Sequence, residues 1–135
     1  MTRQQPTILV IDDESHILHV VSLKLVNAGY RVITAEDGEE GLRAALQYLP
    51  NMIITDFQMP YRTGLELCRE LKTREQTRSI PCVLLTARGF SLSPELLADT
   101  NITAVMSKPF SLREILTRVR QLTQTPPDQE AVDAA

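Results

Sequence analysis

Five short apolar runs, each followed by a segment with helical spacing or a helix-start signal, constrain the fold of this chain more than any other feature. The runs are TILVI (7–11), YRVITA (30–35), NMIIT (51–55), PCVLLT (81–86) and ITAVM (102–106). Their centres are nearly continuous in Val, Ile and Leu, which is typical of strands buried on both faces of a parallel sheet. We therefore predict an α/β fold, a doubly wound five-stranded parallel sheet with helices on both faces.

Capping signals mark the boundaries of the helices between these runs. A Ser, Thr or Asp followed three residues later by Glu, the spacing of a capping box, occurs at Asp37 and Glu40, Thr63 and Glu66, and Ser111 and Glu114. Ser93 followed by Pro94 indicates another helix start, because proline suits the first helical position. Gly29 and Asn101 are expected to end the first and fourth helices in the left-handed conformation.

The length and composition indicate one globular domain. At 135 residues, of which 43% are hydrophobic and 23% charged, the chain has room for a single core. We assign this domain to residues 1–123. Residues 124–135, QTPPDQEAVDAA, are expected to form a flexible tail, because two prolines and few large apolar residues do not continue the pattern.

Charge and hydropathy exclude several classes of protein. The formal net charge of −3 argues against direct binding to nucleic acid, since such domains usually carry a basic face. No apolar run reaches the roughly 20 residues of a membrane-spanning helix, and MTRQQPT lacks the pattern of a secretory signal. We expect a cytoplasmic protein that does not insert into membranes, with Cys68 and Cys82 as reduced, packed thiols.

Chemically reactive side chains stand at the ends of four of the five runs. Asp12 and Asp13 follow the first run, Asp56 follows the third, Thr86 ends the fourth and Lys108 follows the fifth. Because the carboxyl ends of parallel strands lie at one edge of a sheet, these side chains can converge. Neighbouring carboxylates repel one another and need a cation, and Mg²⁺ prefers oxygen ligands of this kind. The sequence predicts a magnesium site where the lysine helps to hold a phosphoryl group.

Each of these residues has a plainer explanation when it is taken alone. An Asp between a strand and a helix is most often an N-cap, Asp56 could begin a turn, and a lysine before a proline is normally solvated. The joint placement at successive strand ends is what favours a site.

Four segments together resemble the receiver domains of two-component response regulators, in particular the single-domain, chemotaxis-regulator-like members: ILVIDDE, IITDFQMPYRTGLEL, VLLTA and SKPF. The resemblance covers about residues 6–123 and implies the flavodoxin-like strand order 2-1-3-4-5. It also implies a phosphoacceptor signalling protein, which takes a phosphoryl group from the phosphohistidine of a sensor histidine kinase or a histidine phosphotransfer protein. Phosphorylation would then alter binding to a downstream protein. The absence of an output domain after residue 123 fits a stand-alone regulator and equally a fragment of a longer one.

The resemblance assigns roles to the acids. Asp56 would be the nucleophile that becomes an aspartyl phosphate. Asp13 and Asp56 would bind Mg²⁺ directly, the main-chain carbonyl of Gln58 would complete the protein ligands, and Asp12 would act mainly through a metal-bound water. We expect a self-catalysed phosphoacceptor with autodephosphorylation rather than a conventional enzyme.

Two further residues would act on the phosphoryl group. Lys108 would pair with Asp56 before transfer and with a phosphoryl oxygen after it, while Thr86 would turn its hydroxyl toward that group. Pro109 matches the family's proline after a cis peptide bond, which would aim the lysine.

Three positions bear on lifetime and signalling. Gln58 and Arg88 lie two residues beyond the phosphoacceptor and the threonine, where the family tunes the rate of phosphoryl loss. Val105 stands where many members carry an aromatic side chain that reports phosphorylation. A valine cannot swing a ring, so we expect helix or loop shifts to carry the signal.

The first predicted helix has apolar residues on two faces. One face, expected in the core, contains Leu18, Val21, Leu25 and Ala28, and the other contains His16, His19, Leu23 and Val26. The second face is either a set of scattered surface apolar residues or a docking stripe for the phosphohistidine helices of a kinase. A zinc site at the two histidines is disfavoured, because no third ligand is evident.

Three rival functions share parts of this pattern. A flavodoxin-like nucleotide binder would need a Ser/Thr/Gly-rich phosphate loop after the first strand, where this chain has Asp-Asp-Glu. An aspartyl-phosphate phosphohydrolase would resemble a D-x-D spacing, whereas the two acids here are adjacent. A receiver fold kept only as a binding scaffold is disfavoured by the complete set of site residues.

Overall fold

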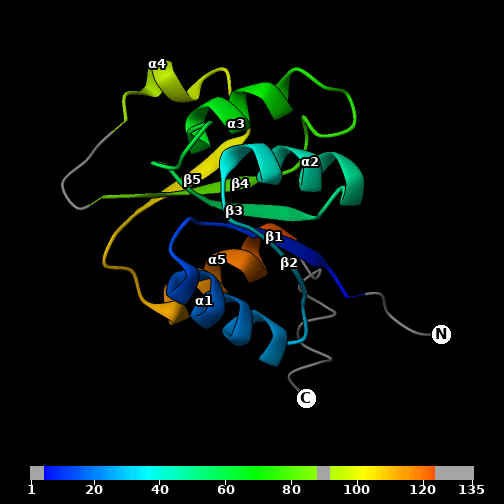
Figure 1. The fold of residues 1–135 in the computed structure, drawn as a ribbon, viewed down its shortest axis with the longest axis vertical. Helices are drawn as coiled ribbons and strands as arrows, with labels where there is room; N and C mark the ends of the chain where they lie inside the picture. Colours follow the sequence, from blue (N-terminus) through cyan, green and yellow to red (C-terminus); the bar gives the residue numbers. More distant parts are fainter. Residues whose placement is uncertain (1–4, 88–91, 124–135) are drawn as a thin grey trace.

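The computed structural model describes residues 5–87 and 92–123. A five-stranded parallel sheet has the strand order β2-β1-β3-β4-β5 (Figure 1). The strands are β1 (Thr7–Ile11), β2 (Arg31–Ala35), β3 (Met52–Asp56), β4 (Cys82–Thr86) and β5 (Ile102–Ser107). The predicted fold class and strand order are therefore confirmed. The tail predicted for residues 124–135 lies outside the described residues.

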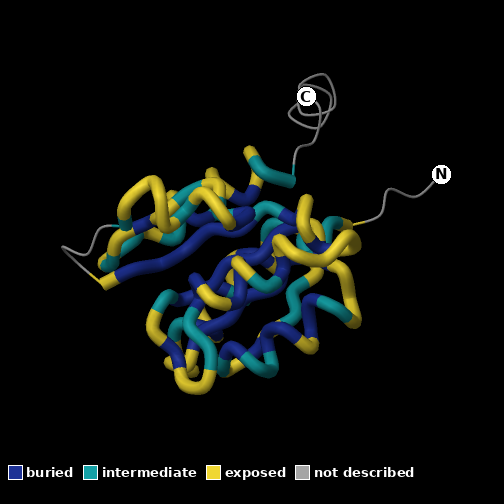
Figure 2. The backbone as a smooth tube through the Cα atoms, turned by 90° about the horizontal axis from the view of Figure 1, so that it is seen from above, coloured by how far each residue is buried: buried dark blue, intermediate teal, exposed yellow. Residues whose placement is uncertain are grey.

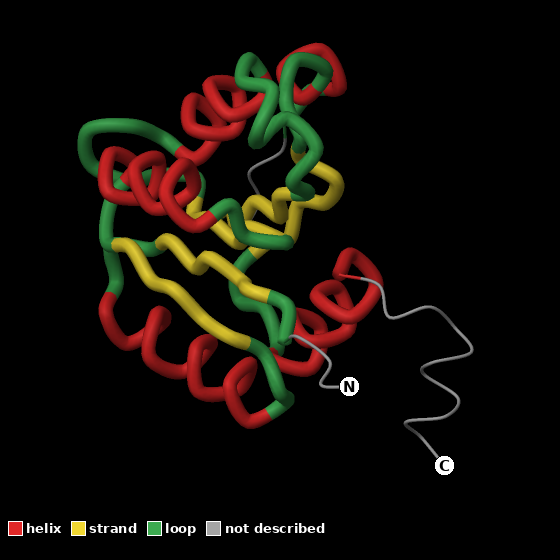
Figure 3. The backbone as a smooth tube through the Cα atoms, turned by 90° about the vertical axis from the view of Figure 1, so that its right-hand side faces the viewer, coloured by secondary structure: helices red, strands yellow, loops and turns green. Residues whose placement is uncertain are grey.

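Helices cover both faces of this sheet. They are α1 (Ser15–Asn27), α2 (Gly38–Tyr48), α3 (Gly64–Lys72), α4 (Pro94–Leu97) and α5 (Leu112–Thr123). In Figure 1, α2 and α3 lie on one side of the sheet and α1 and α5 on the other, and Figure 3 shows the same layers from the side. None of the described helices is long and apolar enough to cross a membrane.

Two apolar cores fill the space between the three layers. One core joins alternate residues of β1 and β3, such as Leu9 and Ile53, to α2 and α3. The other joins the intervening residues, such as Val10 and Ile54, to α1 and α5. Figure 2 shows the buried backbone of the sheet running through the middle of the molecule. Burial of successive strand residues on opposite faces explains why the central strands read as continuous apolar runs.

The helix-start predictions are largely confirmed. Thr63 and Glu66 form a complete capping box at α3, and Ser111 and Glu114 exchange the same two bonds at α5. Asp37 caps α2 by accepting from the N–H of Glu40 at 2.8 Å, but the Glu40 carboxylate bonds the N–H of Glu36 instead of that of Asp37. Ser93 likewise accepts from the N–H of Leu96, at 3.4 Å.

Of the two predicted helix ends, the one at Gly29 is confirmed and the one at Asn101 is wrong. Gly29 follows α1 with φ 101°, a left-handed conformation that favours glycine. Asn101 is not among the described residues with positive φ. Its side chain is buried, and its amide donates to the carbonyls of Ile80 at 2.6 Å and Thr77 at 3.5 Å. The buried carbonyls before β4 require a donor, and Asn101 supplies it.

The helix between β4 and β5 is the shortest of the described helices. It has only four residues, and β5 is an edge strand. Val105 of β5 remains 38% exposed. A valine therefore lies at the surface of the sheet edge, at the position where the resemblance led us to look for an aromatic side chain.

The capping box of α3 gives a prediction about stability. We expect Thr63→Ala to lower the free energy of unfolding by about 1 kcal/mol, because the N–H of Glu66 loses its acceptor. Thr63→Ser keeps the hydroxyl and should unfold close to wild type. Urea denaturation followed by circular dichroism measures both variants, and equal losses in the two would contradict the role of the cap.

Candidate functional site

The carboxyl ends of four strands bring the predicted site residues to one edge of the sheet. Asp12 follows β1 directly, Asp56 is the last residue of β3, and Thr86 is the last residue of β4. Lys108 follows β5, and its N–H donates to the carbonyl of Thr86 at 2.8 Å. Parallel pairing of neighbouring strands is what aligns residues so distant in the sequence.

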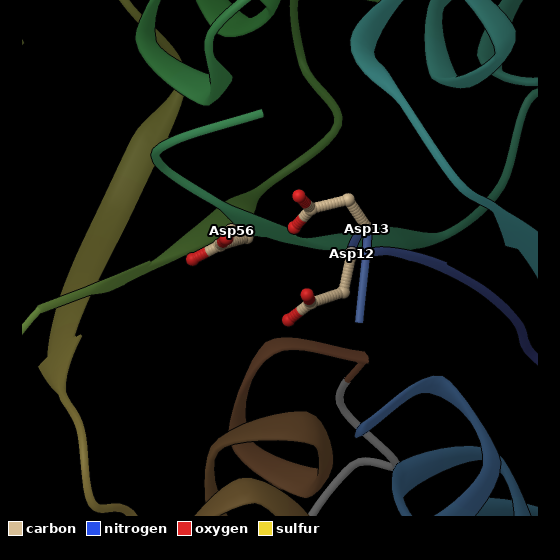
Figure 4. A group of neighbouring side chains, drawn as sticks. All are labelled: Asp12, Asp13 and Asp56. Carbon is tan, nitrogen blue, oxygen red and sulfur yellow. The ribbon is translucent and has the colours of Figure 1, made fainter. Parts of the chain in front are cut away.

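Three carboxylates gather at this edge. Figure 4 shows Asp12 and Asp13 beside the end of β1, with Asp56 next to them at the end of β3. One oxygen of each lies within 4.8 Å of the others, and residues 5–87 and 92–123 contain no other such group of acidic, His or Cys side chains. Asp12 and Asp56 are buried, whereas Asp13 is exposed.

Lys108 is the cation of the acid pocket. Its Nζ lies 3.3 Å from Oδ1 of Asp56 and 3.8 Å from Oδ2 of Asp12. It also contacts Oε1 of Glu14 at 3.2 Å. The Lys108–Pro109 peptide bond is cis, as the resemblance led us to expect.

The electrostatics of the pocket follow from crowding acids where water is scarce. Burial raises the pKa of Asp12 to about 6 from the ordinary value of 3.8, and the charge of Asp56 adds to the shift. Burial also raises the pKa of Asp56, while Lys108 acts against that rise. For Lys108, burial opposes the charged form, but Asp12, Asp56 and Glu14 outweigh it and the pKa rises. The ammonium of Lys108 alone therefore does not neutralise the surrounding carboxylates.

The donor chemistry of the pocket fits a hard divalent cation. The ligand atoms are carboxylate oxygens within reach of a common centre. Asp12 is fully buried, and its Oδ2 has no hydrogen-bond partner. A buried carboxylate oxygen without a donor is costly, and a metal ion or its coordinated water would satisfy it.

The loop between β3 and α3 is held tightly against the pocket. The N–H of Phe57 donates to the carbonyl of Leu85, and the N–H of Gly64 donates to the carbonyl of Phe57, both at 2.8 Å. A Cβ at Gly64 would overlap the carbonyl oxygen of Asp56, so only glycine permits this close approach. Gln58 lies in this loop with its side chain exposed.

Of the two remaining predicted residues, the structure describes Thr86 but not Arg88. Thr86 is fully buried, and its hydroxyl donates to the carbonyl of Met106 at 3.5 Å. The hydroxyl therefore contacts β5 in this structure. Arg88 lies outside the described residues.

Glu14 is the site residue that sequence analysis did not assign. It directly follows the two aspartates. The sequence feature that could have indicated its role is this run of three consecutive acids, at the strand end to which the lysine was also predicted to come close. Its contact with Lys108 spans 94 positions of the chain, so only tertiary structure reveals it.

The fold and the acid pocket together define a receiver domain. The chain belongs to the response regulator receiver domain family, which matches residues 8–120. It is 38% identical over 115 residues to the alkaline phosphatase synthesis transcriptional regulatory protein PhoP of Bacillus subtilis, covering 85% of this chain and 47% of the relative. It is 31% identical over 126 residues to the response regulator ArlR of Staphylococcus aureus, covering 93% and 56%. The chain thus spans about half the length of these relatives.

Solved receiver structures agree with this assignment. The chemotaxis protein CheY4 of Vibrio cholerae is 30% identical with a TM-score of 0.78, covering 88% of this chain and 99% of that one. The receiver domain of the Francisella response regulator 1452 is 29% identical with a TM-score of 0.79, covering 88% and 97%. The receiver domain of the sensor histidine kinase PA1611 of Pseudomonas aeruginosa, at 24% identity and a TM-score of 0.80, covers 90% and 100% and supports the fold alone.

The raised pKa of Asp12 predicts how stability varies with pH. The folded protein binds the proton of Asp12 more tightly than the unfolded chain, so this contribution is complete below pH 3.8 and lost as the pH rises through about 6. In EDTA at about pH 7.5, we expect Asp12→Asn to raise the free energy of unfolding by on the order of 1–3 kcal/mol. The gain should shrink toward pH 4, where wild-type Asp12 is itself protonated.

The matched control for this prediction is the neighbouring exposed acid. Asp13→Asn removes the same charge from an exposed residue, so its gain should be smaller. Thermal melts of both variants across the pH range give the comparison. An Asp12→Asn variant that is no more stable than wild type at about pH 7.5 would refute the effect of burial.

Proposed function

We propose that Asp56 accepts a phosphoryl group from the phosphohistidine of a sensor histidine kinase or a histidine phosphotransfer protein. A carboxylate oxygen of Asp56 would bond to phosphorus as the phosphorus–nitrogen bond of the donor breaks, and the electron pair of that bond would remain on the imidazole. The observation that carries this proposal is the convergence of Asp12, Asp13, Asp56 and Lys108 at one sheet edge.

Magnesium is the cofactor that the acids would hold. Asp13, Asp56 and the main-chain carbonyl of Gln58 would be direct ligands, and Asp12 would act mainly through a coordinated water. When bound, Mg²⁺ would neutralise the acids and the charge that builds up on the phosphoryl oxygens. The three carboxylates within 4.8 Å of one another and the unpartnered, buried Oδ2 of Asp12 support this choice of cofactor.

The remaining residues would bind the phosphoryl group from the protein side. The ammonium of Lys108 lies 3.3 Å from Oδ1 of Asp56. After transfer it would contact a phosphoryl oxygen instead. Thr86 would exchange its 3.5 Å contact with Met106 for another phosphoryl oxygen. Movement of its hydroxyl away from β5 would couple phosphorylation to that strand.

The protein would act as a self-catalysed phosphoacceptor and not as a conventional enzyme. Asp56 and its neighbours supply the nucleophile and the charge stabilisation, so a small acyl phosphate should also serve as donor. Gln58 and Arg88 would set the rate of autodephosphorylation. The phosphorylated protein would then bind a downstream protein in the cytoplasm. It would neither contact nucleic acid directly nor insert into a membrane.

The kinase would dock against α1. Leu23 and Val26 are 52% and 53% exposed there, as expected for the stripe. Ile17 and Val20 of α1 also line a groove of about 460 Å³, together with Glu14, Lys108, Pro109, Phe110 and Leu112. An apolar surface that opens onto Lys108 is suited to bring a phosphohistidine helix to Asp56.

The proposal predicts metal-dependent labelling at one residue. We expect acetyl phosphate to label the wild-type protein with Mg²⁺ and not with EDTA, and the label to vanish in Asp56→Asn, which lacks the nucleophilic oxygen pair. Mass spectrometry before and after hydroxylamine treatment measures the label. An unlabelled wild-type protein would instead favour a scaffold role.

The docking surface predicts a selective defect. We expect Leu23→Glu to slow phosphotransfer from the cognate kinase at least several-fold, because it places a charge in an apolar contact, and to leave labelling by acetyl phosphate unchanged. Leu49→Glu is the matched control, since Leu49 is 49% exposed and follows α2, which covers the face of the sheet opposite to α1. Full-rate transfer to Leu23→Glu would rule this surface out.

A further inference from the structure

Lys108 contacts more acids than the proposed transfer requires. Its Nζ lies 3.3 Å from Asp56, 3.2 Å from Glu14 and 3.8 Å from Asp12. The shortest of these contacts is with Glu14, whose side chain is half exposed. The ammonium is thus shared between the buried carboxylate of Asp56 and the half-exposed carboxylate of Glu14.

We propose that Glu14 is a positioning residue that competes with the phosphoryl group on Asp56 for Lys108. Its carboxylate holds the ammonium at 3.2 Å, and phosphorylation requires Lys108 to leave it. The inference rests on the proposed phosphoacceptor role of Asp56 and adds a residue that sets how readily that role is carried out.

The backbone holds Glu14 in place for this contact. Its N–H donates to Oδ1 of Asp12 at 2.9 Å, and its carbonyl accepts from the N–H groups of Ile17 and Leu18 in the first turn of α1. Glu14 is the N-cap of α1, yet its side chain makes no capping bond. The carboxylate is therefore free to reach Lys108, which a capping side chain would not be.

The charges favour competition over cooperation. An ammonium has three donors, but the phosphoryl group would bring further anionic oxygens to Asp56 within the same small volume. Glu14 would then both retain Lys108 and repel the incoming anion, since like charges at such distances destabilise one another. Both effects act in the same direction, and removing this carboxylate should favour the phosphoryl-bound state.

Beryllofluoride, which mimics a phosphoryl group on aspartate, provides the test. At saturating Mg²⁺ we expect Glu14→Gln to bind it about two- to fivefold more tightly than wild type, the scale of a partly exposed ion pair. Glu14→Asp keeps the charge but is one methylene shorter, and its affinity should lie between those of wild type and Glu14→Gln, because the contact with Lys108 is lost while the repulsion remains. Glu75→Gln makes the same change in net charge at an exposed residue after α3 and should match wild type.

A second measurement follows the lysine itself. In the metal-free protein, the ¹⁵N resonance of the Lys108 ammonium should shift in Glu14→Gln and Glu14→Asp and stay in place in Glu75→Gln. Thermal melts of all variants test whether each remains folded.

The outcomes separate this inference from the proposed function. A wild-type protein that binds no beryllofluoride overturns the phosphoacceptor role and the inference with it. Wild-type binding with unchanged affinity in Glu14→Gln overturns the inference alone, as would weaker binding. If Glu14→Asp matches wild type while Glu14→Gln binds more tightly, net charge and not the contact is responsible, and the positioning role is wrong.

Discussion

Repulsion among buried carboxylates at the end of the sheet is the constraint on which the rest of this structure depends. Asp12 and Asp56 lie where burial favours their neutral forms, and Lys108 is the cation that the chain places among them. A fold optimised for stability alone would put apolar residues there. In the function that we propose, this cost has a use, because crowded oxygen ligands beside one ammonium would bind a metal and a phosphoryl group.

The surrounding fold supplies the rigidity that this arrangement needs. Four strands deliver the site residues, and two apolar cores hold those strands from both faces. Gly64 lets α3 begin directly against the carbonyl of Asp56, and the capping box at Thr63 begins that helix. The hydrogen bond from the N–H of Lys108 to the carbonyl of Thr86 then joins the loop after β5 to the end of β4. Electrostatic strain at the edge is thus balanced by ordinary packing and hydrogen bonding behind it.

Local patterns predicted most of this architecture. The apolar runs predicted the bounds of every strand to within about a residue. The residues that follow these runs correctly predicted that the acids, the threonine and the lysine lie at one edge of the sheet. Asn101 was misassigned because asparagine tolerates the left-handed conformation and was therefore expected to end a helix. Its actual role is to donate a hydrogen bond to the buried carbonyl of Ile80, and the sequence does not show that this carbonyl lacks another donor. The partner of Glu40 was missed for a similar reason, since both Glu36 and Asp37 offer an N–H within reach.

The sequence by itself determined the periodicity, the capping residues and which chemical groups stand at each strand end, because these depend on contacts between neighbours in the chain. Tertiary structure decided how the charges are shared. Lys108 lies 52 positions from Asp56 and 94 from Glu14, and its distances to them follow from the pairing of β4 with β5 and the path of the loop beyond. Electrostatic energy depends on distance and burial, so the competition for one ammonium exists only once the chain has folded.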